Sequence, residues 1–291
     1  AVSADLITDS EVGDTLKVSF TFDEAMDQTV IPTVSFAPDI ASTIPLTPGS
    51  GAWLDDFTFE VTATVADDNF DADEVTIDIT GAKDAAGNLQ TDHTATVGLE
   101  VDTQNPTVVS FVSEILSDTQ TDGVSADADN VVAYTVTFSE PISGIDAVDL
   151  DVAGGSLVPE SIDLSEDGLT ATFKVQALDE STADLVVKVL NSVEDVNGNN
   201  LADPNNTATS SPVAVDTVNP TVDITSSQAG SVAYDDANSV TYTLEFSEPV
   251  QSVTADDLIV DGGVIANVVH TGAIATVTVT VADDSTDNVE I

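Results

Sequence analysis

The sequence contains no cysteine and no arginine, and only four lysines oppose 53 acidic side chains. Without cysteine, the chain cannot form a disulfide, a thiolate zinc site, an iron–sulfur cluster or a cysteine nucleophile. The formal net charge of −49 argues against a nucleic-acid partner, because phosphate binding requires a basic surface. It also argues against docking on an anionic membrane through a basic patch.

Long apolar runs are missing as well. No stretch approaches the roughly 18 apolar residues of a membrane-spanning helix, so we expect no direct membrane insertion. The first residues, Ala1–Asp5, lack the basic and apolar regions of a signal peptide, and we expect none. The acidity does not indicate disorder, because apolar residues make up 42% of the chain.

The acidic residues are mostly of one kind, 39 aspartates against 14 glutamates. Glutamate favours helices, whereas aspartate favours turns, caps and metal sites with oxygen ligands. The charge is therefore expected in loops. An acid excess that serves solubility in high salt would instead spread evenly over the sheet faces.

Internal repeats define the organisation of the chain. The repeated blocks are Val101–Val108 with Val215–Val222, Phe138–Ile142 with Phe246–Val250 and the degenerate Phe22–Met26, and Asp84–Asn88 with Asp195–Asn199. Their order is the same in each copy, which predicts domains at residues 1–102, 103–216 and 217–291. The third copy lacks a counterpart of the last strand, so we expect the natural protein to continue.

Apolar and polar residues alternate in several stretches, which predicts half-buried antiparallel strands. These stretches are Leu16–Phe22, Phe57–Val65, Val132–Phe138, Leu169–Val175 and Val240–Phe246. No stretch shows helical periodicity. About seven short strands in about 100 residues predict an all-β protein, with tandem immunoglobulin-like β-sandwich domains in a linear array. Trp53 and Met26, which occur once each, are expected in the core.

Acidic loops are expected to meet at the domain junctions, because strands alternate in direction and place loops of neighbouring domains at facing ends. The candidates at the first junction are Asp9, Asp67, Asp68, Asp102, Asn105, Glu140 and Asp195. Those at the second are Asp127, Asp129, Asp179, Asp216, Asn219 and Glu248. Glu24 and Asp84 are the counterparts of Glu140 and Asp195 in the first copy.

Several carboxylates in one place repel one another and raise their pKa values. Calcium resolves this repulsion, because it takes six to eight oxygen ligands in flexible geometry, whereas magnesium demands an octahedron and keeps its waters. We therefore predict Ca²⁺ at the junctions. The alternative for any single aspartate is a turn former on a solubilising surface.

Other chemistry has little support in the sequence. Asp195–Asn199 imitates the start of an EF-hand loop, but Asn200 and Asn206 stand where glycine and glutamate are required. His93 and His270 lie in different domains, which disfavours a shared zinc site. No nucleophile elbow or phosphate-binding loop occurs, and we expect no enzyme.

The segment Phe138–Ile142, followed by Val148–Leu150 and Gly154–Gly155, resembles the bacterial Ig-like repeat, as does Phe246–Gly263. The Asp-x-x-Gly-Asn loop and the Val-Asp-Thr-x-x-Pro linker complete the pattern. The resemblance implies an extender region of a giant adhesin that is exported by type I secretion, as in repeats-in-toxin adhesins. It further implies a location at the bacterial cell surface and calcium that stiffens the junctions. The expected partners are neighbouring repeats of the same chain, in a monomer.

The first copy departs from this pattern at Phe22–Met26 and carries an insertion-like stretch at Ile31–Trp53. This divergence leaves two alternatives to a passive extender. In the first alternative, the first domain is a ligand- or glycan-binding module that uses Trp53 as a contact. In the second alternative, the chain is part of a surface-layer lattice.

Overall fold

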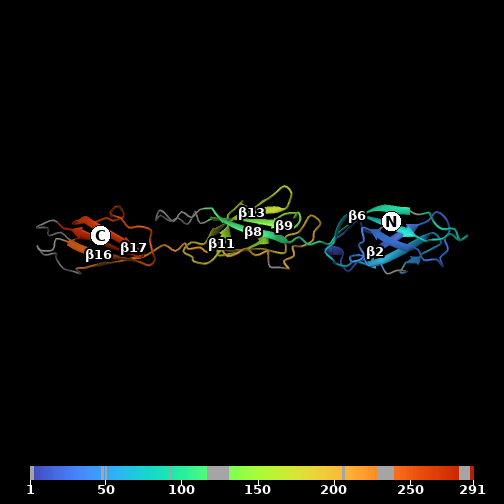
Figure 1. The fold of residues 1–291 in the computed structure, drawn as a ribbon, viewed down its shortest axis with the longest axis horizontal. Helices are drawn as coiled ribbons and strands as arrows, with labels where there is room; N and C mark the ends of the chain where they lie inside the picture. The colour runs from blue at the N-terminus through green and yellow to red at the C-terminus, as the bar shows by residue number, and fades with distance from the viewer. Residues whose placement is uncertain are drawn as a thin grey trace. The chain divides into compact units, whose positions relative to one another are not determined.

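The computed structural model describes residues 3–46, 49, 51–91, 93–116, 131–204, 207–227, 239–281 and 289–291, with backbone only at 93–98. These residues form β-strands and three short 3₁₀ helices, with no α-helix among them, which confirms the all-β prediction (Figure 1). No described helix has the length and apolar character needed to cross a membrane.

The chain divides into two compact units. The first comprises Ala1–Ser117, Val131–Ala177 and Asp184–Ala214, and the second comprises Asp118–Asn130, Leu178–Ala183 and Val215–Ile291. The first unit contains two separate sets of sheets, which we call the first sandwich (residues 3–103) and the second sandwich (the described residues of 107–116, 131–177 and 184–213). The first unit therefore includes the predicted first domain and most of the predicted second domain, whereas residues 178–183 of the latter lie in the second unit.

Two sheets enclose the core of the first sandwich. One has the order β1 (Leu6–Ile7), β7 (His93–Asp102), β6 (Asp71–Thr80) and β3 (Thr33–Ala37), and the other has β2 (Thr15–Thr21), β5 (Thr58–Thr64) and β4 (Ala52–Trp53). The 3₁₀ helix η1 (Asp9–Glu11) follows β1. Strands β1 and β7 are parallel, and the other pairs are antiparallel.

The alternating sequence determines which side chains face this core. In β2, Leu16 and Val18 are buried whereas Lys17 is exposed, as period-two patterning requires. Met26 is buried. The Trp53 ring is half-buried, and its Nε1–H donates a 2.9 Å hydrogen bond to the Val30 carbonyl. Both residues therefore serve the core, as predicted.

The second sandwich pairs β11 (Gly155–Leu157), β13 (Thr170–Ala177), β9 (Val131–Phe138) and β8 (Val108–Ile115), with β12 (Asp163–Leu164) also beside β13. A second sheet holds β10 (Leu150–Ala153), which follows η3 (Ala147–Asp149), and β14 (Val186–Val189). The rings of Tyr134 and Phe173 stack at 5.5 Å between centroids, and both side chains are fully buried.

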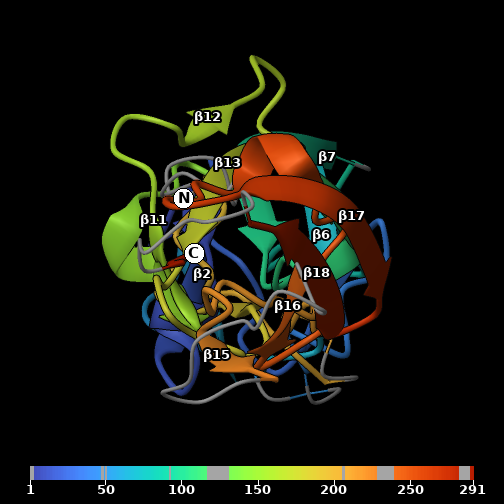
Figure 2. The same cartoon turned by 90° about the vertical axis from the view of Figure 1, so that its left-hand side faces the viewer.

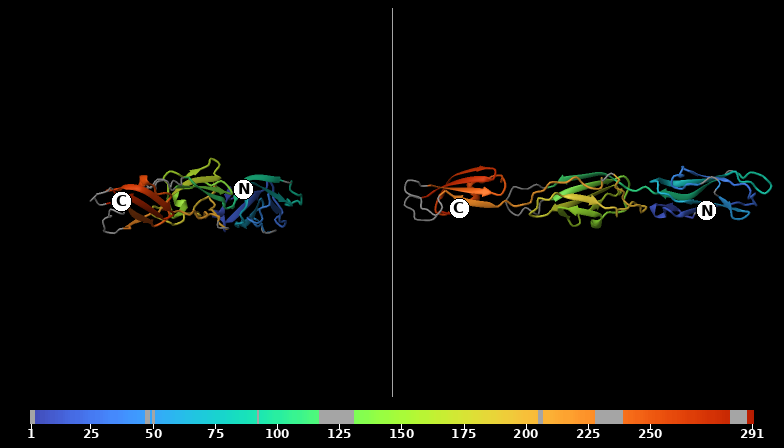
Figure 3. Two further views of the ribbon diagram at one scale, coloured as in Figure 1. Left: turned by 60° about the vertical axis from the view of Figure 1, so that its left-hand side comes forward. Right: turned by 90° about the horizontal axis from the view of Figure 1, so that it is seen from below.

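The second unit contains one sheet in the described residues, with the order β15 (Val222–Ser226), β16 (Ser239–Phe246), β18 (Ile274–Thr280) and β17 (Val264–Thr271) (Figure 2). The short helix η4 (Ala255–Asp257) precedes β17. Buried residues of β16 and β18 form its core, with Tyr242, Leu244 and Val277 among them. Figure 3 shows the strands of both units from two further sides.

Candidate metal centre

The linker residue Asp102 closes β7 and is only 4% exposed. The next residue, Thr103, is fully buried, and its backbone N–H donates to the Phe70 carbonyl at 2.8 Å. The Phe70 N–H in turn donates to Thr103 Oγ1 at 3.1 Å. The start of the linker is therefore fastened to the first sandwich, which fixes the position of Asp102.

The Asp-x-x-Gly-Asn loop of the second sandwich positions Asp195 through its own backbone. The N–H groups of Asn197 and Asn199 donate to Asp195 Oδ1 at 2.7 and 2.9 Å. Asn199 Nδ2 donates to Asp195 Oδ2 at 2.8 Å. Gly198 has a φ of +93°, a conformation that glycine adopts without steric cost. This short motif therefore holds a carboxylate in one orientation, and Asp195 is 2% exposed.

The same loop binds the linker. Asn199 is fully buried, and its Nδ2 also donates to the Asp102 carbonyl oxygen at 3.0 Å. Asn197 Nδ2 donates to Asp102 Oδ2 at 2.7 Å. The loop of the second sandwich thus joins the end of the first through two side-chain amides.

Glu140 follows β9 and completes an acidic group. Gln104 Nε2 donates to its Oε1 at 3.3 Å. One carboxylate oxygen each from Asp102, Glu140 and Asp195 lies within 4.8 Å of the other two. The donors are all oxygen atoms and the group is largely buried, so these three residues could hold a metal ion.

The pKa of Glu140 reflects its burial and the neighbouring carboxylates. Burial raises the pKa of its carboxyl from 4.5 to about 7, and the charges of Asp102, Asp195 and Asp71 act in the same direction against the Gln104 hydrogen bond. Within the described part of the chain, the one ion pair is Lys17–Glu60, at 4.0 Å. No described lysine therefore forms an ion pair with the acidic group.

Asp9 of η1 lies beside this group. Its backbone N–H donates to Asn199 Oδ1 at 2.9 Å, and its Oδ2 accepts from Asn105 Nδ2 at 2.6 Å. Its Oδ1 is buried without a hydrogen-bond partner. Burial raises the pKa of Asp9, the Asn105 hydrogen bond opposes it, and the charges of Asp67, Asp195 and Asp102 add to it. An unpaired buried carboxylate oxygen among other acids fits a cation site.

Three contributors were missed by reasoning from the sequence. Asp71 pairs with Asp102 across β6 and β7, and its pKa is raised by burial and then by the charge of Asp102. Asn197 and Asn199 hold the linker. The repeated Gly-Asn dipeptide was a signal for Asn199, whereas Asp71 required knowledge of the strand register.

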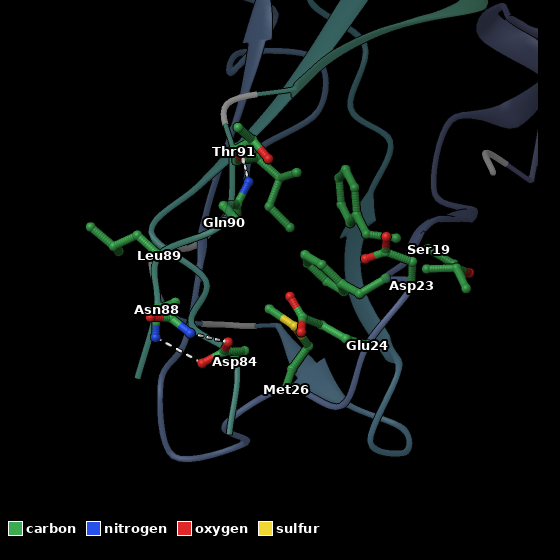
Figure 4. A pocket seen from close by; sticks show the side chains of 13 residues that line it. Ser19, Asp23, Glu24, Met26, Asp84, Asn88, Leu89, Gln90 and Thr91 are labelled. Carbon is green, nitrogen blue, oxygen red and sulfur yellow. Dashed lines mark hydrogen bonds between the residues drawn. The ribbon is translucent and has the colours of Figure 1, made fainter. Parts of the chain in front are cut away.

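The other predicted ligands do not join this group in the described residues. Glu24 and Asp84 line a separate pocket of the first sandwich (Figure 4). Asp67 acts on Asp9 only through its charge, and Asp68 is exposed.

The second predicted set lies in the second unit. Asp179, Asp216, Asn219 and Glu248 form no three-acid group within metal-binding distance in the described part of the chain. Asp127 and Asp129 lie outside the described residues. The Asp-x-x-Gly-Asn motif that supplies Asp195 has no copy after residue 217 in this sequence. Metal binding by this set therefore stays a prediction.

Among the described residues, the acidic group of Asp102, Glu140 and Asp195 is the one that could hold a cation. It lies between the two sandwiches of the first unit. Comparison of the sequence with protein-family models and with curated proteins finds no match.

Proposed function

We propose that this chain is a calcium-rigidified extender region of a bacterial cell-surface adhesin, built of tandem immunoglobulin-like domains. The observation that carries the proposal is the convergence of Asp102, Glu140 and Asp195 where the two sandwiches of the first unit meet. The resemblance of the repeats to bacterial Ig-like extender domains supports the mechanical role.

Calcium suits this donor set better than other common metals do. Zinc sites use histidine or cysteine, and the group contains neither. Magnesium takes few carboxylates and keeps its water ligands, whereas calcium accepts many carboxylate, amide and carbonyl oxygens. The unpaired Oδ1 of Asp9 and the carboxylate of Asp71 are further oxygen donors close by. A divalent cation would offset the burial, and after it the repulsion from neighbouring carboxylates, that raise the pKa of Glu140.

The linker residues supply the rigidity that a cation would complete. Thr103 fastens the linker to the first sandwich, and the Ala202 N–H donates to the Pro106 carbonyl at 2.9 Å in the second. Thr107 N–H donates to Ser139 Oγ at 2.9 Å. Only Gln104 and Asn105 lie between these anchored parts, so little chain is free to bend. Calcium would add coupling between Asp102 of the linker and two loops of the next sandwich.

The glycan-binding alternative loses support at Trp53. Its indole packs against Phe22 and Phe59, with ring centroids 5.4 and 5.2 Å away, and its N–H is already bonded to the Val30 carbonyl. A sugar-binding tryptophan normally presents a free ring face to solvent.

Thermal unfolding and small-angle scattering of the whole chain, each with EGTA and with excess CaCl₂, test the proposal. We expect calcium to raise the melting temperature of the wild type by several degrees. We also expect it to narrow the distribution of molecular dimensions that fits the scattering profile. Asp195→Asn should remove the calcium effect, whereas Asp151→Asn, at an exposed position of β10, should retain it. Identical melting curves and scattering profiles in EGTA and calcium would overturn the proposal.

A further inference from the structure

Asn197 and Gly198 form the one Asn-Gly dipeptide of the chain. They lie in the loop that binds the linker at Asp102, and Ala86 and Gly87 hold the same positions in the first copy of the motif. Asparagine before glycine is especially prone to lose its side-chain amide, because glycine has no Cβ to hinder an attack by its own backbone nitrogen. This reactive pair therefore stands at a contact that joins the two sandwiches.

The backbone nitrogen of Gly198 is available for this attack. In the first copy, the Gly87 N–H donates to the Asp84 carbonyl at 3.0 Å. Within the part of the chain that the structure describes, the Gly198 N–H donates no hydrogen bond, and Gly198 is exposed. Water and hydroxide therefore reach this N–H. Removal of its proton by base is the step that makes the nitrogen a nucleophile.

The leaving amide of Asn197 is held by the linker. Its Nδ2 donates to Asp102 Oδ2 at 2.7 Å, and the Asn197 backbone N–H donates to Asp195 Oδ1 at 2.7 Å. A hydrogen bond to an ionised acceptor is stronger than one between neutral groups. Because Nδ2 must depart for the reaction to proceed, its bond to Asp102 has to break first. The reaction is therefore slow while the junction is closed and faster when the junction opens.

We propose that Asn197 is a site of spontaneous deamidation, at which opening of the junction permits a one-way conversion of the amide into a carboxylate. The Gly198 nitrogen, after loss of its proton, forms a bond to Cγ of Asn197. The Cγ–Nδ2 bond then breaks, and Nδ2 leaves as ammonia with a proton taken from water. A water molecule opens the resulting succinimide at either carbonyl and leaves aspartate or isoaspartate. The net reaction consumes water and releases ammonia, and no group is oxidised or reduced.

Either product loosens the contact between the two sandwiches. An aspartate at position 197 has no side-chain N–H for Asp102 and sets a second carboxylate against it, so the two charges repel. An isoaspartate adds a methylene to the main chain between the N–H groups of residues 197 and 199, which both bind Asp195 Oδ1. The modification thus weakens the junction without any enzyme, and it cannot occur at Ala86 in the first copy.

The test incubates the full chain in EGTA at mildly alkaline pH and follows each asparagine by peptide mapping with mass spectrometry. Asn197 should deamidate before Asn200, and aspartate and isoaspartate should both appear. Asp102→Ala should raise the rate at Asn197 by about tenfold, because it removes the acceptor of Nδ2. Asp151→Ala, at an exposed position of β10, is the control and should keep the wild-type rate. An equal rate in Asp102→Ala and wild type would overturn the proposal.

Two aspartate substitutions test the consequence of the reaction and leave Asp102 unchanged. Asn197→Asp reproduces one of the products, and Asn200→Asp adds the same charge at an exposed position of the same loop. In EGTA, Asn197→Asp should melt several degrees below Asn200→Asp, because only the former sets two carboxylates against each other. Equal melting temperatures of the two variants would overturn the proposed effect on the junction.

The effect of calcium on this reaction rests on the proposed function. A cation held by Asp102 and Asp195 would keep the junction closed, so excess CaCl₂ should slow the deamidation of Asn197 in the wild type several-fold relative to EGTA. Failure of the calcium proposal would appear as equal rates in EGTA and CaCl₂. It would leave the comparisons made in EGTA unchanged, so the two proposals fail separately.

Discussion

The side-chain amide of Asn197 donates a 2.7 Å hydrogen bond to Oδ2 of Asp102, across the junction of two sandwiches. Asn199 adds a second hydrogen bond, to the Asp102 carbonyl. Neutral side-chain amides therefore orient Asp102 without the help of a cation. Such pre-organisation lowers the cost of assembling several carboxylates around one ion.

Removal of Asn199 should destabilise the first unit. Asn199→Ala leaves the Asp102 carbonyl and Asp195 Oδ2 without their buried donor, which costs roughly 1–3 kcal/mol. Urea denaturation in EGTA measures this loss. Asn200→Ala is the control, because Asn200 is exposed and its amide bonds only to the Asn191 carbonyl. An equal effect of the two substitutions would contradict the role assigned to Asn199.

Stability in EGTA should fall as the pH rises through the range between 4.5 and about 7, the ordinary and the raised pKa of Glu140. In this range the folded chain holds a proton on Glu140 that the unfolded chain has released, so a rise in pH favours unfolding. Burial and neighbouring charges raise the pKa values of Asp9 and Asp71 in the same direction.

Melting temperatures measured in EGTA at several pH values check this dependence. Glu140→Gln carries no titrating group at this position and should flatten the decline. Saturating calcium should also flatten it, because the cation favours the ionised carboxylate. A melting temperature that rises between pH 5 and about 7 in EGTA would contradict the assigned direction.

Calcium binding should distinguish the two copies of the Asp-x-x-Gly-Asn loop. Asp195 meets Asp102 and Glu140, whereas Asp84 lines a pocket without a linker aspartate in the described residues. Asp195→Asn should therefore abolish the increase in melting temperature on calcium addition, and Asp84→Asn should retain it. Isothermal titration calorimetry of both variants is the direct measurement. Loss of calcium binding in Asp84→Asn alone would place the site elsewhere.

A close backbone contact in the second sandwich predicts a glycine requirement. A Cβ at Gly155 would lie 2.5 Å from both the Gln176 carbonyl oxygen and Leu185 Cδ2. Gly155→Ala should therefore destabilise the unit by about 1–3 kcal/mol in urea denaturation. Gly144→Ala is the control, since a Cβ there meets nothing within 4 Å, and its effect should stay within about 0.5 kcal/mol.

Local patterns of the sequence determined the strands. Alternation in Leu16–Phe22 and Val132–Phe138 sets which side chains can share a sheet face, because side chains in a strand point to opposite faces in turn. The repeated Asp-x-x-Gly-Asn motif determined its own loop, since its hydrogen bonds join residues at most four apart. The linker repeats predicted where acidic residues gather at the first junction.

Only the tertiary structure decided which of these residues meet. Asp102 and Asp195 are 93 positions apart in the sequence, and their contact depends on strand register and on two asparagine amides. Asp71 joins them through its pairing with Asp102 in the sheet. Asp84 holds the position of Asp195 in the other copy of the motif, yet it lines a pocket instead.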